Sequence, residues 1–114
     1  MVTPTAGEVV LVPFPFSDLS QTKVRPAICL AETGRGDWIL CQITSSRYGD
    51  SSAISLGSSD FSIGGLRIAS YARPGKLFTA HFSLMAKSVG KLKASSLLKL
   101  LDAVVQIIRP ENSP

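Results

Sequence analysis

The pattern of apolar and polar residues predicts a chain made largely of short β-strands. Runs rich in Val, Ile, Leu and Phe alternate with segments rich in Gly, Ser, Asp and Pro, a spacing that favours a small barrel over a parallel sheet. Pro13 is expected to end the pairing of the first strand, because proline has no N–H, and residues 14–24 are expected to form a loop. The expected strands are Glu8–Pro13, Arg25–Ala31, Asp37–Ile43, Ala53–Leu56, Leu66–Tyr71, Lys76–Ala80 and Leu84–Val89, the last before a turn at Gly90.

The pattern changes to a helical one near the C-terminus. It predicts an amphipathic helix of about 14 residues, at about 94–108, packed on a barrel at about 7–92 in one domain spanning 1–114. Ser95 or Ser96 is the expected N-cap, and Pro110 is the expected stop. A polar face with one Lys and one Asp does not favour a membrane-surface helix. The apolar face consists of Leu97, Leu100, Leu101, Val104, Val105 and Ile108, opposite Ser95, Lys99, Asp102 and Gln106.

The second and third expected strands should form an antiparallel hairpin, because the segment ETGRG between them supplies two glycines. A hairpin centred on Gly34 and Arg35 places Cys29 and Cys41 nearly opposite each other. Two facing thiols can form a bridge, but the reducing cytosol expected for this chain favours two small buried apolar side chains.

Composition narrows the class of protein. The chain has 114 residues, a net charge of +4 and 45% apolar residues, which excludes global disorder. Two cysteines and one histidine are too few for a disulfide scaffold or a structural zinc site, and we expect neither a metal nor a cofactor. No apolar run is long enough for a membrane span, and the start MVTPTAGEVV does not resemble a secretory signal. We therefore expect a cytoplasmic protein that does not bind a membrane.

The charge is unevenly distributed. Residues 1–60 carry four basic and six acidic residues, whereas residues 61–114 carry eight basic and two acidic residues. Between Phe61 and Leu101 there are seven bases and no acid. Such a segment can attract phosphates or an acidic partner, or it can simply keep the protein in solution. Charge alone does not decide between these interpretations.

Most catalytic signatures are absent from the sequence. There is no Gly-rich phosphate loop, no G-x-S-x-G and no H-E-x-x-H, and His81 is most simply a surface or loop histidine. Arg25 is distinctive, since the following Pro26 restricts its backbone to extended conformations at the start of a strand. Thr44 and Ser45 end the next strand at the same end of the hairpin. Arg25 and Thr44 can together grip a phosphate, or they can be an exposed arginine and a strand-capping threonine.

Several segments, in order along nearly the whole chain, resemble the MazF/PemK/Kid family of bacterial toxin–antitoxin systems. The resemblance implies an SH3-like barrel with a C-terminal helix, acting as a homodimer. It also implies a metal-independent endoribonuclease that cuts single-stranded RNA by 2′-hydroxyl attack, leaving a 2′,3′-cyclic phosphate and a 5′-hydroxyl. An acidic antitoxin is the implied partner. The matching segments are GEVVLVPFPFSD (Gly7–Asp18), KVRPAICL (Lys23–Leu30), ITS (Ile43–Ser45), SYARPGKLFT (Ser70–Thr79) and SLMAKSVGKL (Ser83–Leu92).

The resemblance also implies roles for individual residues. Arg25 matches the family's arginine before the strand-opening proline, and Thr44 matches its threonine after the third strand, so both are the expected catalytic residues. Arg73 matches a second arginine of Kid-like members. The expected RNA-binding residues are Lys23, Ser45, Arg73 and Lys76.

This sequence departs from the Kid-like pattern at two places. Gly75 stands where those members carry an aspartate, and residues 14–24 lack their histidine, so a mechanism with a carboxylate base does not transfer. Two alternatives remain at this stage. One is a gyrase poison of the CcdB type, although the chain ends in RPENSP without the Trp-Gly-Ile of that group. The other is an RNA-binding or protein-binding module without catalysis.

Overall fold

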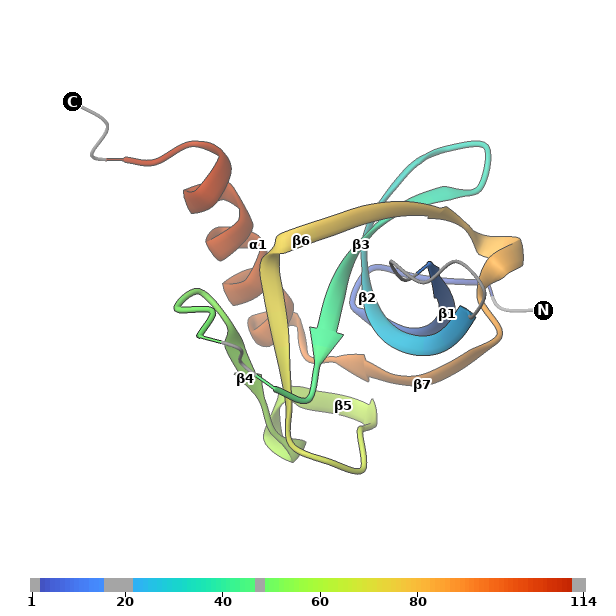
Figure 1. Cartoon of the computed structure of the whole chain (residues 1–114), viewed down its shortest axis with the longest axis horizontal. Helices are drawn as coiled ribbons and strands as arrows, with labels where there is room; N and C mark the ends of the chain where they lie inside the picture. Colours follow the sequence, from blue (N-terminus) through green and yellow to red (C-terminus); the bar gives the residue numbers. More distant parts are fainter. Residues whose placement is uncertain (1–2, 16–21, 47–48, 112–114) are drawn as a thin grey trace.

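The computed structural model of the chain describes residues 3–15, 22–46 and 49–111. Within these residues seven strands form one antiparallel sheet in the order β4-β6-β3-β2-β1-β7-β5, which curls around itself, and a helix packs beside it (Figure 1). The expected fold class, mainly β with a C-terminal helix, is confirmed. The elements are β1 (Glu8–Pro15), β2 (Thr22–Gly34), β3 (Asp37–Thr44), β4 (Ile54–Leu56), β5 (Phe61–Gly64), β6 (Ser70–His81), β7 (Lys87–Leu92) and α1 (Ala94–Ile108), with 3-10 turns at Ser58–Asp60 and Phe82–Leu84.

Two apolar clusters occupy opposite faces of the curled sheet, because side chains alternate between the faces along each strand. Val9 belongs to the first cluster and its neighbour Val10 to the second. The first cluster includes Leu100 and Val104 of α1, so it lies between the sheet and the helix. The second cluster includes Trp38 and Leu40 of β3. Both faces of the central strands are therefore buried, which leaves polar side chains to gather at strand ends.

The expected hairpin of β2 and β3 is confirmed, but its cysteines do not face each other. Cys29 lies opposite Leu40, and Cys41 lies opposite Ile28. An offset of one residue moves a side chain to the other face of the sheet, so the two thiols lie in different apolar clusters. Both are free and fully buried, and loss of hydration on burial raises the pKa of each to about 12. The prediction of two buried apolar-like side chains is therefore confirmed.

The first strand is longer than expected. β1 continues past Pro13 to Pro15, and its pairing with β2 extends to Pro15 opposite Thr22. The pairing of β1 with β7 ends at Leu11. Among the described residues, the part of β1 after Leu11 is therefore paired with β2 alone, and its other side is open. Proline is tolerated there, because its missing N–H is not needed on the open side. The expected loop at 14–24 is correspondingly too long: Phe14 lies in β1, and residues 22–24 lie in β2; residues 16–21 lie outside the described part.

Three other predicted strands differ from the structure. Residues 66–69 are irregular, so the expected strand Leu66–Tyr71 is wrong, and β6 instead runs without a break from Ser70 through the expected strand Lys76–Ala80. The strand expected at Leu84–Val89 begins only at Lys87 and includes Gly90 instead of turning there. A Cβ on Gly90 would lie 2.7 Å from the Ile63 carbonyl oxygen, so this glycine allows β5, which was not predicted, to approach β7 closely.

The C-terminal helix is confirmed with a different start, and Val105 and Ile108 of its expected packed face are exposed. Lys93 is the N-cap residue and makes no side-chain capping hydrogen bond, so the expected caps Ser95 and Ser96 lie inside the helix. The Ser96 hydroxyl instead donates to the Asp60 carboxylate at 2.8 Å, which ties the first turn of α1 to the segment before β5. In the described part of the chain, no helix has the length and apolar character needed to cross a membrane.

Candidate functional site

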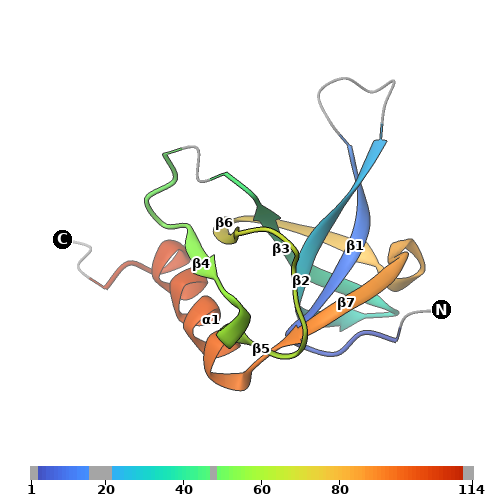
Figure 2. The same cartoon turned by 90° about the horizontal axis from the view of Figure 1, so that it is seen from below.

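A pocket forms where β2 begins and β3 ends, beside the connection between β5 and β6. Four of the six predicted site residues line it: Lys23 and Arg25 on β2, Thr44 at the end of β3, and Ser45 directly after it. Figure 2 shows the connection from β5 to β6 passing in front of β2 and β3. The expected juxtaposition of Arg25 with Thr44 is therefore present, and it is produced by the β2–β3 hairpin.

The register of the sheet explains why Arg25 and Thr44 meet. Ala27 lies opposite Gln42, so two residues further along the hairpin Arg25 reaches the level of Thr44. On its other side Arg25 lies opposite Val12 of β1. The Arg25 Nε atom is buried, whereas the side chain as a whole is partly exposed. A guanidinium with one of its three nitrogens buried is restricted in direction, and its planar fork of donors is suited to an anion.

The Thr44 side chain is almost completely buried, with 5% exposed. Its hydroxyl oxygen accepts a hydrogen bond from the Ser46 N–H at 3.2 Å. A hydroxyl that accepts from the backbone keeps its own hydrogen for donation. The geometry therefore supports both readings of the sequence, since Thr44 caps the end of a strand and also presents a directional donor beside Arg25.

A third positively charged side chain, which is not among the site residues predicted from the sequence, also lines the pocket. Arg67 lies in the irregular connection at 65–69, and with Lys23 and Arg25 it brings three cations to the pocket. No acidic side chain lines this pocket among the described residues. Gly64 and Gly65, both with positive φ, were the available signal that the chain turns there instead of continuing as a strand. Two of the three cations come from the acid-rich half of the chain, so the positive pocket is a product of folding.

Arg73 and Lys76, the other two predicted residues, lie outside this pocket. The Arg73 side chain forms an ion pair with Asp50, with 2.8 Å between Nε and Oδ2. Lys76 is exposed and lines a separate, mainly apolar hollow beside Phe14 and Phe78. The site expected from the sequence is thus divided into a pocket around Arg25, an ion-paired arginine and a separate lysine.

Arg73 nevertheless shares a face of the sheet with the pocket residues. Gln42 lies opposite Arg73, and Thr44 lies opposite Tyr71. Residues two apart on a strand point to the same side, so Gln42 places Arg73 on the face of Thr44 and Arg25. Gly75 is exposed, and the carboxylate beside Arg73 is Asp50, which precedes it by 23 residues.

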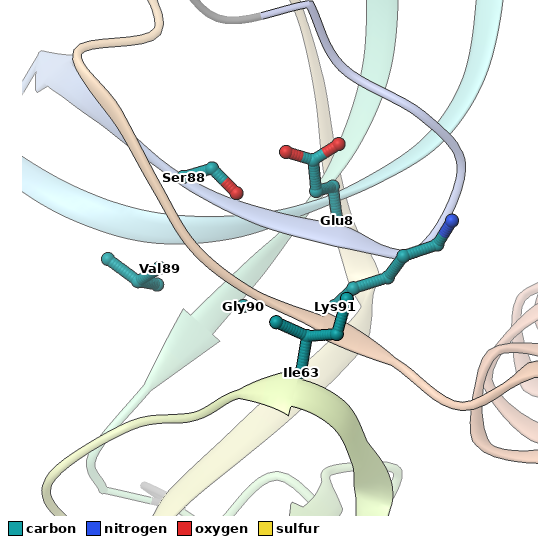
Figure 3. Close-up of a pocket in the computed structure, with 6 residues that line it drawn as sticks. All are labelled: Glu8, Ile63, Ser88, Val89, Gly90 and Lys91. Atoms are coloured by element: carbon teal, nitrogen blue, oxygen red, sulfur yellow. The ribbon is translucent and has the colours of Figure 1, made fainter.

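Further polar groups of the described residues lie outside the pocket. No cluster of three or more His, Cys, Asp or Glu side chains is placed to hold a metal ion in residues 3–15, 22–46 and 49–111. His81, at the far end of β6, bonds through Nδ1 to the Ser83 hydroxyl at 2.8 Å. A further hollow at β1, β5 and β7 carries Glu8 and Lys91, whose charged ends extend in different directions (Figure 3). It contains none of the predicted site residues.

Comparison with known proteins identifies the class. Residues 5–108 match the family described as PemK-like, MazF-like toxin of type II toxin–antitoxin system. The chain therefore belongs to this toxin family, in agreement with the resemblance noted from its motifs.

Solved structures agree on the fold. A MazE–MazF complex from Deinococcus radiodurans superposes with a TM-score of 0.76 at 18% identity, covering 97% of this chain and 100% of that chain. The Mycobacterium tuberculosis toxin MazF-mt6 gives 0.68 at 17% identity, with coverages of 89% and 95%. A structure described as an endoribonuclease from a mycobacterial species gives 0.69 at 17% identity, with coverages of 95% and 93%. No curated protein sequence matches the chain significantly.

Proposed function

We propose that this toxin is a metal-independent endoribonuclease that cuts single-stranded RNA, and that the pocket at the ends of β2 and β3 is its active site. The observation that carries the proposal is the pocket itself. It gathers Lys23, Arg25 and Arg67 around the hydroxyls of Thr44 and Ser45, with no acidic side chain in its described lining. Concentrated positive charge beside hydroxyl donors is suited to a phosphodiester.

The proposed reaction is attack of a ribose 2′-hydroxyl on the adjacent phosphorus. The bond from phosphorus to the 5′-oxygen breaks, which leaves a 2′,3′-cyclic phosphate and a 5′-hydroxyl. Negative charge builds on the five-coordinate phosphorus during this step, and preorganised donors stabilise that charge more than the ground state. In our proposal Arg25 supplies the fixed guanidinium, the Thr44 hydroxyl donates to a non-bridging oxygen, and Lys23, Ser45 and Arg67 hold the strand.

The described residues do not place a tuned general base in this pocket. The hydrogen bond from Arg73, together with those from Ser52, lowers the pKa of Asp50 to about 2, so its carboxylate has little affinity for a proton near neutral pH. Arginine, with a pKa above about 12, is a poor base as well. Catalysis in the proposed site therefore rests on stabilising charge, and we expect a slow nuclease.

We further propose that the whole chain, 1–114, works as one domain and as a homodimer. Leu98, Val105 and Ile108 lie exposed along α1, with 60%, 56% and 72% of their surfaces accessible. An apolar stripe of this kind is a candidate subunit contact.

The partner that we propose is an acidic antitoxin segment, which the positive pocket would attract. A toxin that cuts RNA acts in the cytoplasm, the location that we propose.

The first test of the function is cleavage of single-stranded RNA in EDTA. We expect 5′-hydroxyl and cyclic phosphate ends, and about 10²–10³-fold slower cleavage by Arg25→Ala, since one such donor contributes that much. Arg25→Lys keeps the charge but loses the planar fork, so it should recover little. Arg109→Ala, an exposed site at the end of α1, is the control with equal loss of charge. Cleavage that needs a metal, or products with 5′-phosphate, would contradict the mechanism.

A second test separates the two readings of Thr44. If its hydroxyl donates to the reacting phosphate, Thr44→Val should slow cleavage by about 10²-fold while Thr44→Ser retains most of it. Thr79→Val, at an exposed position of β6, controls for the loss of a threonine hydroxyl from a strand. If Thr44 only caps its strand, Thr44→Val will cleave RNA normally and unfold more easily.

Two other outcomes correspond to the alternatives. RNA binding without any cleavage, in a protein that binds RNA through the same pocket, would indicate a binding module. Inhibition of gyrase supercoiling with no effect on RNA would indicate a CcdB-like poison.

A further inference from the structure

The ion pair between Arg73 and Asp50 joins two parts of the chain that are distant in sequence. The Arg73 Nε donates to the Asp50 Oδ2 at 2.8 Å, and the two side chains are only 20% and 14% exposed. Arg73 lies on β6, directly opposite Gln42 of β3. Within the described residues this is the one side-chain hydrogen bond that Arg73 donates.

The second carboxylate oxygen of Asp50 accepts hydrogen bonds within the turn at residues 50–53. Oδ1 accepts from the Ser52 N–H at 3.0 Å and from the Ser52 hydroxyl at 2.8 Å, while the Asp50 carbonyl accepts from the Ala53 N–H at 3.2 Å. This turn leads into β4, where Ile54 lies opposite Ala72 of β6. One carboxylate therefore ties the turn at 50–53 to β6.

The same turn belongs to the connection that begins at the candidate active site. Thr44 ends β3 and Ser45 follows it, and both line the pocket. The start of the connection is fixed by the hydrogen bond from the Ser46 N–H to the Thr44 hydroxyl, and its end by Asp50 and Arg73. Because β6 lies between β3 and β4 in the sheet, the chain crosses from one side of β6 to the other between Thr44 and Ile54.

We propose that Asp50 and Arg73 form an anchor for this connection, and that Arg73 is a positioning residue for the pocket and not a ligand of RNA phosphate. The inference rests on the proposed nuclease function. From the sequence, Arg73 was expected to bind RNA directly. In this proposal it instead holds Asp50 in place. The charge of Arg73 is balanced by its partner, whereas Lys23, Arg25 and Arg67 line a pocket with no acid in its described lining.

The two interpretations of Arg73 predict opposite effects of Asp50. Asp50→Ala raises the net charge of the chain above +4 and Arg73→Ala lowers it. An anchor needs both partners, so both variants should raise the KM for RNA and lower kcat/KM by about 10- to 10²-fold. The double variant should be no worse than Asp50→Ala alone, because Arg73 acts only through its contact with Asp50.

If Arg73 instead binds a phosphate, Asp50→Ala should improve RNA binding while Arg73→Ala weakens it. The dependence of log K on log[salt] adds an independent readout, since each phosphate contact on single strands contributes about 0.7 to the slope. The anchor predicts an unchanged slope for Arg73→Ala, and a loss of about 0.7 would overturn it. Asp102→Ala and Arg109→Ala make the same charge changes at exposed sites and serve as controls.

Amide hydrogen exchange tests the anchor without RNA. Residues 49–53 should lose protection in both Asp50→Ala and Arg73→Ala, more so in Asp50→Ala because that change also removes the acceptor of the Ser52 N–H, with the rest of the sheet unchanged. Unchanged protection in either variant would overturn the anchor. If the wild-type protein does not cut RNA but the exchange result holds, the nuclease proposal fails while the anchor stands as a structural contact.

Discussion

At the scale of single residues, this molecule separates its charged groups by what surrounds them. The resemblance implied a role in RNA cleavage or binding for both Arg25 and Arg73, yet one lines a positive pocket and the other is paired with a carboxylate. The difference comes from Asp50, which precedes Arg73 by 23 residues and contacts its side chain. Two arginines that carry the same charge therefore have different surroundings in the folded protein, and we expect them to have different roles.

The Asp50–Arg73 ion pair leads to a prediction about how the stability of the fold depends on pH. Its hydrogen bonds lower the pKa of Asp50 from an ordinary value near 3.8 to about 2. A lowered pKa in the folded state stabilises the fold at pH values above about 4, and this contribution is lost as the pH falls through about 2. Asp50→Asn should therefore be less stable than wild type at pH 7, by an amount that shrinks between pH 4 and pH 2.

Urea unfolding across this pH range measures the effect. Asp102→Asn, at an exposed position of α1, controls for the loss of one negative charge. A difference for Asp50→Asn that is as large at pH 2 as at pH 7 would show that the carboxylate does not stabilise the fold through its ionised form.

At the scale of elements, two glycines decide how the short strand β5 joins the sheet. A Cβ on Gly64 would lie 2.3 Å from the Val89 carbonyl oxygen, and one on Gly90 would lie 2.7 Å from that of Ile63. The two backbones can approach each other only because both positions lack a side chain. From the sequence, Gly90 favoured a turn, because the signal of a glycine does not distinguish a turn from a close approach between strands.

This close approach predicts that Gly90→Ala destabilises the fold by about 1–3 kcal/mol, the usual cost of overpacking. For a domain of this size, that corresponds to a fall in Tm of at least about 4 °C. Gly75→Ala is the matched control, since its Cβ would meet only the Ile107 side chain at an ordinary 3.7 Å. Equal melting temperatures for the two variants would contradict the packing seen between β5 and β7.

At the scale of the whole molecule, folding concentrates positive charge that the sequence spreads over both halves. The split between an acidic first half and a basic second half suggested a surface within residues 61–114. The pocket instead combines Lys23 and Arg25 with Arg67.

Salt dependence checks whether this pocket binds RNA. With three cations in contact with phosphates, log K for a short single-stranded RNA should fall against log[salt] with a slope near −2. Arg67→Ala should reduce the magnitude of the slope by about 0.7, whereas Arg109→Ala should leave it unchanged. An unaltered slope in Arg67→Ala would remove Arg67 from the interface.

The sequence by itself determined the class of the protein, the hairpin of β2 and β3, the C-terminal helix and the meeting of Arg25 with Thr44. These features depend on local patterns: apolar spacing, a glycine turn and the register that a short hairpin imposes. Only the tertiary structure decided the opposite faces of Cys29 and Cys41, the contribution of Arg67 and the partner of Arg73. Those depend on bulges and on contacts between residues far apart in the chain, which no local pattern encodes.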